Sequence, residues 1–157
     1  MRNSRLTSVL LLLFITLTSK YATAACLQFS GKYVVNSAGC YTLLDGIKYS
    51  DNTYSGMDIS ADDSSNNLSM HYREGGDRGY TVTYIADGNE HDGDYYNSGK
   101  TYTASCDVSQ IKSTRNGMFI APFMMTFSQE ADGTFTLTET ITASRPFTRS
   151  CSFAKAP

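Results

Sequence analysis

From residue 27 onward the chain consists almost entirely of short segments in which apolar and polar residues alternate. Thr, Tyr, Phe and Val dominate these segments, and branched or aromatic side chains of this kind fit the pleated surface of a β-sheet. Clusters of Gly, Asn, Asp and Ser separate the segments and favour tight turns. No stretch of about 11 residues or more shows the apolar spacing of an amphipathic helix. The sequence therefore predicts an all-β domain.

The alternation predicts about eight or nine strands with short connections. Such a chain favours a single antiparallel meander that closes into a barrel or flattens into a sandwich. Closure also removes exposed edge strands. The predicted strands cover residues 27–35, 41–44, 54–60, 68–73, 80–85, 101–108, 118–127, 134–142 and 147–154.

The N-terminus has the three-part layout of a secretory signal peptide. A basic start with Arg2 and Arg5 precedes an apolar run over 6–17, and a polar stretch leads to Ala22-Thr23-Ala24. These last residues match a small-x-small cleavage site, and the apolar run is shorter than the roughly 20 residues that cross a bilayer. We predict that 1–24 is a signal peptide and that one domain, 25–157, is secreted or periplasmic.

Charge excludes one class of partner. Three of the 13 Lys and Arg residues lie in the leader, whereas all 15 Asp and Glu residues follow it. The mature domain is therefore acidic and lacks the clustered basic side chains that bind phosphate backbones. We predict no nucleic-acid partner, and no later apolar stretch is long enough to predict a membrane anchor.

Four cysteines follow the leader, at positions 26, 40, 106 and 151. An even number of cysteines in an oxidising compartment favours disulfides, so we predict two disulfides and no metal site. The alternative is acylation of Cys26, which lies next to the cleavage region. Thr23 argues against it, because a lipobox normally has an aliphatic residue there.

The last predicted hairpin contains an unusual pair of charges. In 134–142 the threonines share one face, so Glu139 shares the other, core-facing side with Phe135 and Leu137. If the hairpin closes around Ser144, Glu139 lies opposite Arg149. Inward-facing charges of this kind can bind the polar head of a ligand. The alternative is a structural ion pair near the barrel mouth, where solvent would screen it.

We therefore assign five residues to a candidate ligand site. They are Phe135, Leu137, Glu139, Arg149 and, from another strand, Tyr102.

The segment 87–94 concentrates carboxylates and one of the two histidines. Its start resembles a calcium loop, but the sixth position is not Gly and the twelfth, Ser98, is not Glu. A solvated loop is the better interpretation. An exposed loop of this kind can also act as an interaction surface, and its candidate contact residues are Glu90, His91, Asp92, Tyr95 and Tyr96.

No arrangement of residues indicates catalysis or a cofactor. The chain has no Gly-x-Ser-x-Gly sequence, its cysteines are assigned to disulfides, and its two histidines lie apart. We predict no enzymatic activity, no catalytic residue and no cofactor.

Several short motifs resemble a set of uncharacterised small secreted bacterial proteins. The opening Cys26-Leu27-x-x-x-Gly31-Lys32-Tyr33 is similar to their first strand. These proteins in turn resemble calycin-type barrels, the lipocalin and fatty-acid-binding group, which often carry Gly-x-Trp where this chain has Tyr33. The resemblance implies a barrel with an interior pocket and no particular activity. Further similar segments are 84–91, 102–106, 132–137 and 151–155.

Four cysteines allow three pairings. A turn at 36–39 would fold Cys40 back towards Cys26, and the resemblance favours the same choice, so we predict Cys26–Cys40 and Cys106–Cys151. The rival pairing joins Cys26 to Cys151 and Cys40 to Cys106, because the last strand of a closed barrel lies beside the first.

Taken together, the sequence predicts a secreted, non-enzymatic binding protein. Its partner would be a small apolar ligand inside the barrel or a protein on the surface, where the segment 118–127, apolar on both faces, could supply a patch. The alternative is an inhibitor of a host or cell-wall enzyme that acts through the exposed loop at 87–99.

Overall fold

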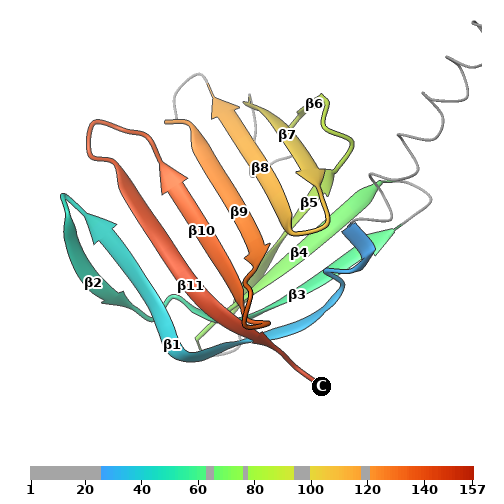
Figure 1. The fold of residues 1–157 in the computed structure, drawn as a ribbon. Coiled ribbons are helices and arrows are strands. Elements are labelled where there is room, and N and C mark those ends of the chain that lie inside the picture. Colours follow the sequence, from blue (N-terminus) through green and yellow to red (C-terminus); the bar gives the residue numbers. More distant parts are fainter. Residues whose placement is uncertain (1–25, 63–65, 76–77, 94–99, 118–120) are drawn as a thin grey trace, which may run out of the picture.

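The computed structural model describes residues 26–62, 66–75, 78–93, 100–117 and 121–157, which form an antiparallel, nearly closed β-barrel (Figure 1). The predicted signal peptide lies outside the described residues. In the part of the chain that the structure describes, no helix is long and apolar enough to cross a bilayer.

The barrel is built from a long series of strands. They are β1 (Gly31–Leu44), β2 (Ile47–Asp51), β3 (Tyr54–Asp62), β4 (Asn67–Glu74), β5 (Gly79–Ile85), β6 (Glu90–Asp92), β7 (Lys100–Cys106), β8 (Gln110–Gly117), β9 (Phe123–Gln129), β10 (Phe135–Ile141) and β11 (Phe147–Lys155).

The strands follow one another as an up-and-down meander. Their order is β5-β4-β3-β1-β11-β10-β9-β8-β7-β6, and β2 pairs with β1 beside this path. The meander closes where β1 pairs antiparallel with β11. The remaining gap lies between β5 and β7, where Ile85 N–H donates to the Tyr102 hydroxyl at 3.1 Å and Gly88 N–H donates to the Ala104 carbonyl at 2.8 Å. The predicted all-β meander barrel with two disulfides is confirmed.

Strand β1 continues through a segment that the sequence predicts as a turn. Its pairing with β11 shifts register between Val35 and Cys40, so 36–39 forms a bulge inside one strand. The Asn36 side chain stabilises the bulge: its Oδ1 accepts from Ala38 N–H at 2.9 Å, and its Nδ2 donates to Ser152 Oγ at 2.7 Å. Turn-forming residues do not end the strand here because β11 pairs with the chain on both sides of them.

The sequence pattern also misses three strands and misassigns one segment. Strands β2, β6 and β8 are short or polar; β8 has Ile111 as its single aliphatic side chain. Neighbouring ladders hold such segments extended without a strong local signal. Residues 27–29, predicted as strand, instead belong to a turn over 26–29 in which Phe29 N–H donates to the Cys26 carbonyl at 3.1 Å.

Aromatic side chains fill one half of the barrel, near the starts of β1 and β10. Tyr33 on β1 and Phe127 on β9 are separated by two strands of the sheet, β11 and β10, and their ring centroids lie 5.1 Å apart. Phe29 covers this end from the 26–29 turn, with its ring 6.1 Å from that of Phe127. Phe135 packs 5.0 Å from Tyr33. These rings exclude water from this end, and each fully buried side chain contributes about 1.5–3 kcal/mol.

The disulfides are Cys26–Cys106 and Cys40–Cys151. The predicted pairing, Cys26–Cys40 and Cys106–Cys151, is wrong, and so is its rival. The bulge keeps β1 extended, so Cys40 moves away from Cys26 and lies directly opposite Cys151 in the β1–β11 register. Cys26 lies on the 26–29 turn, bonded to the last residue of β7. Among the described residues no cysteine is a free thiol, which leaves no sulfur for acylation.

We predict that replacing both Cys40 and Cys151 by Ser lowers the free energy of unfolding by about 4–5 kcal/mol, because this disulfide closes a loop with a sequence separation of 111. Denaturant titration of the variant and the wild type measures the difference. Peptide mapping without reduction is the companion measurement, and a peptide that links Cys26 to Cys40 would contradict the structure.

Candidate functional site

The β10–β11 hairpin brings the two predicted charges together. Its register places Glu139 opposite Arg149 and Leu137 opposite Cys151, as the alternation of the sequence predicts. Arg149 Nη1 lies 3.2 Å from Glu139 Oε2. Thr136 and Thr138, on the alternate face, pair with Ser152 and Ser150. The expected inward-facing ion pair is therefore confirmed.

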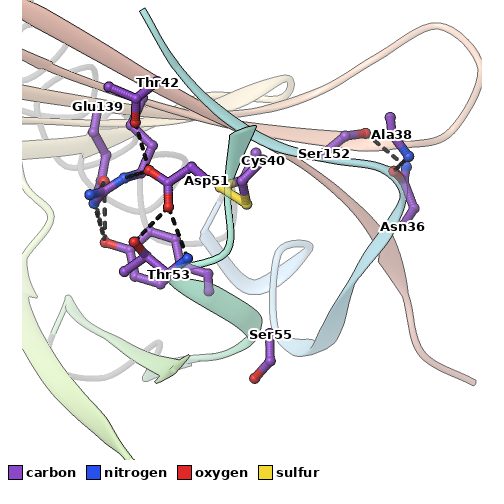
Figure 2. Close-up of a disulfide and its surroundings, with 12 residues drawn as sticks. Asn36, Ala38, Cys40, Thr42, Asp51, Thr53, Ser55, Glu139 and Ser152 are labelled. Atoms are coloured by element: carbon purple, nitrogen blue, oxygen red, sulfur yellow. Dashed lines mark hydrogen bonds and ion pairs between the residues drawn. A yellow bond between two sulfur atoms is a disulfide. The ribbon is translucent and has the colours of Figure 1, made fainter. Parts of the chain in front are cut away.

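A second carboxylate, which the sequence analysis does not include, completes the site. Asp51 ends β2, and its Oδ2 lies 2.7 Å from Arg149 Nε. The same oxygen accepts from Thr42 Oγ1 at 2.6 Å, while Oδ1 accepts from the Thr53 hydroxyl at 2.6 Å and from Thr53 N–H at 2.8 Å. Figure 2 shows Thr42, Asp51, Thr53 and Glu139 gathered beside the Cys40 disulfide. The guanidinium thus lies between two acids from different strands.

Tyrosine hydroxyls extend the network across the lumen. Tyr54, on β3, donates towards both Glu139 oxygens at 3.2 Å, and its hydroxyl lies 2.9 Å from that of Tyr80. Arg149 Nη1 also lies 3.4 Å from the Tyr54 hydroxyl. The rings of Tyr54, Tyr72 and Tyr80 follow one another with centroids 5.3 Å and 4.9 Å apart. We call Asp51, Tyr54, Tyr80, Glu139 and Arg149 the mouth cluster.

The mouth cluster is buried more deeply than a solvent-screened pair would be. The exposed fraction of the side chain is 5% for Glu139 and 9% for Asp51, but 23% for Arg149. The structure therefore does not fit the expectation of a screened ion pair. Charges held this far from water couple strongly, and removing one partner leaves another buried without compensation.

Burial and hydrogen bonding shift the pKa values of the two carboxyl groups in opposite directions. Burial raises the pKa of Glu139, and Arg149 and Tyr54 offset this only in part. Burial acts on Asp51 too, but the hydrogen bonds from Thr42, Thr53 and Arg149 outweigh it and hold the Asp51 pKa well below its usual range. Burial also raises the pKa of the Tyr54 and Tyr80 phenols. At neutral pH these hydroxyls are therefore hydrogen-bond donors.

The other predicted ligand residues lie outside the mouth cluster. Leu137 and Phe135 are buried one and two positions deeper along the inner face of β10, where Phe135 packs with Tyr33. Tyr102 lies at the gap between β5 and β7, with its ring 5.4 Å from that of Tyr84. Sequence reasoning missed Asp51 and both tyrosines. Tyr54 and Tyr80 each lie in a predicted strand. The contact between Tyr54 and Glu139, however, forms only because the barrel closes and brings β3 close to β10.

The proposed interaction loop is partly described. Glu90, His91 and Asp92 form β6 and pair with β7, while Tyr95 and Tyr96 lie outside the described residues. Asp87 organises its own turn, because its Oδ1 accepts from Asn89 N–H at 2.9 Å and lies 2.8 Å from His91 Nε2. Within the described ranges, no three His, Cys, Asp or Glu side chains gather in a way that could hold a metal ion.

No protein-family model matches this sequence, and no curated protein matches it. The nearly closed, antiparallel barrel is compatible with a calycin-type fold. The features that bear on function are therefore the chemistry of the mouth cluster and the exposed surface.

We predict that Arg149→Leu lowers the free energy of unfolding by about 3 kcal/mol or more, because it leaves the buried Glu139 and the partly buried Asp51 without their cation. The control is Asp58→Asn, which removes the partner of Arg73 from a pair whose side chains are about one-third exposed. It should cost less than about 1 kcal/mol. Urea unfolding of both variants measures the effects, and equal small losses would contradict the buried network.

We predict opposite pH trends for the two acids. Folding raises the Glu139 pKa, so its stabilising contribution is complete below the unfolded value, about 4.3, and is lost as pH rises through the folded pKa. The stability of Glu139→Gln relative to the wild type should therefore increase with pH across that window. Folding lowers the Asp51 pKa, so the deficit of Asp51→Asn should shrink as pH falls below about 4. Unfolding free energies measured against pH would refute the assignment if both variants followed the same trend.

Proposed function

We propose that the chain is a secreted or periplasmic, non-enzymatic binding protein that holds a small, mainly apolar molecule by its polar head at the mouth of the barrel. The observation that carries the proposal is the position of Arg149. It is the most exposed of the three charged groups, while Glu139 is buried and Asp51 is partly buried. A guanidinium in this position faces the lumen and can still reach a ligand.

The hydrogen-bond donors of Arg149 that the mouth cluster does not use indicate which ligand head group would bind. Within the described residues, its hydrogen bonds to the mouth cluster use Nε and Nη1, so the Nη2 hydrogens point elsewhere. The Tyr54 hydroxyl hydrogen is already donated to Glu139, and the Tyr80 hydroxyl then donates to Tyr54, so the guanidinium supplies the donors for a ligand. A ligand head rich in acceptor oxygens, such as a carboxylate or sulfonate, matches this cationic donor.

The strand registers supply an apolar wall next to the charges. One layer towards the mouth from Glu139 and Arg149, the inner face carries Phe147, Ile141 and Phe123, which are paired across β11, β10 and β9. These side chains are only partly buried. A ligand could therefore place its head on Arg149 and its apolar body along this layer.

The calycin resemblance and the cysteine chemistry support the same proposal. Calycin-type barrels have an interior pocket, and the barrel described here is compatible with that architecture. The two disulfides agree with an oxidising compartment, and the leader at 1–24 would direct the chain there.

We predict that anilinonaphthalene sulfonate, an aromatic fluorophore with an anionic head, binds the wild type more tightly than its uncharged parent, phenylnaphthylamine. Arg149→Lys keeps the charge but loses the planar guanidinium fork, so it should weaken sulfonate binding at least about tenfold and leave the uncharged probe nearly unaffected. The matched control is Arg145→Lys, at an exposed arginine outside the mouth cluster.

Fluorescence titration of both probes decides between the outcomes. Equal effects of the two substitutions, or no difference between the probes in the wild type, would overturn head-group recognition by Arg149. Native mass spectrometry of protein purified from its own host then identifies any co-purifying ligand by its mass.

A further inference from the structure

Strand β2 is the part of the described sheet most exposed to solvent. Residues 47–50 are all exposed, including Ile47 at 56% and Tyr49 at 49%. One edge of β2 pairs with β1, and among the described residues no strand pairs with the other edge. Figure 1 shows the β1–β2 hairpin extending away from the barrel. The hairpin therefore carries an open β-edge with apolar side chains.

The turn geometry determines which backbone groups face this open edge. Asp45 and Gly46 connect β1 to β2, both with positive φ (51° and 80°), as in a two-residue hairpin turn. In such a hairpin the closing pair, Leu44 and Ile47, is hydrogen-bonded, and bonded pairs then alternate along the ladder. The N–H and C=O groups of Lys48 and Ser50 therefore point outward.

Natural proteins often protect open edges with a lysine, but Lys48 does not protect this one. Its ammonium lies 4.0 Å from the centre of the Tyr41 ring, over the outer face of β1. Ile47 and Tyr49 occupy the opposite face. The charge is thus drawn back onto its own hairpin, and the outward backbone groups remain accessible.

We propose that two copies of this chain associate through their β2 edges across a two-fold axis, so that the sheet continues as β1-β2-β2-β1. An antiparallel edge is complementary to its own two-fold copy, which makes a second copy a chemically matched partner. The proposal is independent of ligand binding at the mouth cluster.

Two constraints, the charge of Lys48 and the positions of the outward backbone groups, select one register. Only Lys48 and Ser50 have backbone groups that face the new interface. Three two-fold symmetric registers are therefore possible. Lys48 opposite Lys48 of the partner subunit would oppose two like charges, which is unfavourable. Ser50 opposite Ser50 of the partner subunit gives a single bonded pair. Lys48 opposite Ser50 of the partner subunit gives two bonded pairs and no opposed charges, so this register is favoured.

The favoured register places Tyr49 opposite Tyr49 of the partner subunit. This pair is not hydrogen-bonded across the interface, so the two Cα atoms should lie about 4.5 Å apart. The aromatic rings would then cover each other on the face that also carries Ile47. Because β2 is short, the contact should bury less than the roughly 1,600 Å² of a standard interface, and we expect a concentration-dependent dimer.

Sedimentation velocity of the mature, disulfide-bonded chain over a range of concentrations tests the proposal. The wild type should shift from monomer to dimer. Tyr49→Asp opposes two carboxylates and Ser50→Pro removes one outward N–H, so each should weaken dimerisation at least about tenfold. The matched control, Val108→Asp, changes an 81% exposed residue away from β2 and should behave as the wild type does.

A cysteine scan tests the register separately. Tyr49→Cys should form an intermolecular disulfide on mild oxidation, because the expected Cα separation is within disulfide range, whereas Val108→Cys should not. A wild type that stays monomeric at every concentration would overturn the proposal. A dimer that Tyr49→Asp and Ser50→Pro leave intact, or that Tyr49→Cys does not cross-link, would overturn it equally.

Discussion

The antiparallel pairing of β1 with β11 is the contact on which the rest of the structure depends. It joins the beginning and the end of the described domain and converts an open meander into a nearly closed barrel. Its register places Cys40 opposite Cys151 and Thr42 opposite Arg149. Strand β2, paired on the other side of β1, then brings Asp51 beside the guanidinium. Closure of the barrel and assembly of the mouth cluster are thus one event.

The same registers arrange the inner side chains in layers, and the order of the layers explains the electrostatics. One layer is apolar and lies immediately beneath the charges: Cys40, Cys151, Leu137, Phe127 and Ile111. The next layer towards the mouth carries the charges: Thr42, Arg149, Glu139, Met125 and Ser113. Because the apolar layer excludes water from below, Glu139 is buried and its pKa rises, while Arg149 keeps contact with the mouth.

Features that depend on residues close together in the sequence could be predicted, whereas features that depend on long-range strand pairing could not. The β10–β11 hairpin was predictable in register, because alternation assigns each face and the nearby turn limits the offset between the strands. The bulge at 36–39 was not, since its turn-forming residues give the same local signal in a turn and in a bulge. The disulfide pairing failed for that reason. Asp51 and Tyr54 reach Arg149 only through long-range pairing, which no local pattern encodes.

The bulge also accounts for the exposed strand. Strand β3 pairs with β1 only along Gly31–Val34, so the part of β1 after the bulge, Cys40–Leu44, would otherwise face solvent on one side. Strand β2 covers that side, but it moves the open edge outward by one strand instead of removing it. Barrel closure therefore pairs the backbone N–H and C=O groups along most of the described sheet but leaves those on the outer edge of β2 unpaired. The geometry that aligns Cys40 with Cys151 and assembles the buried charges also creates the surface on which two copies can meet.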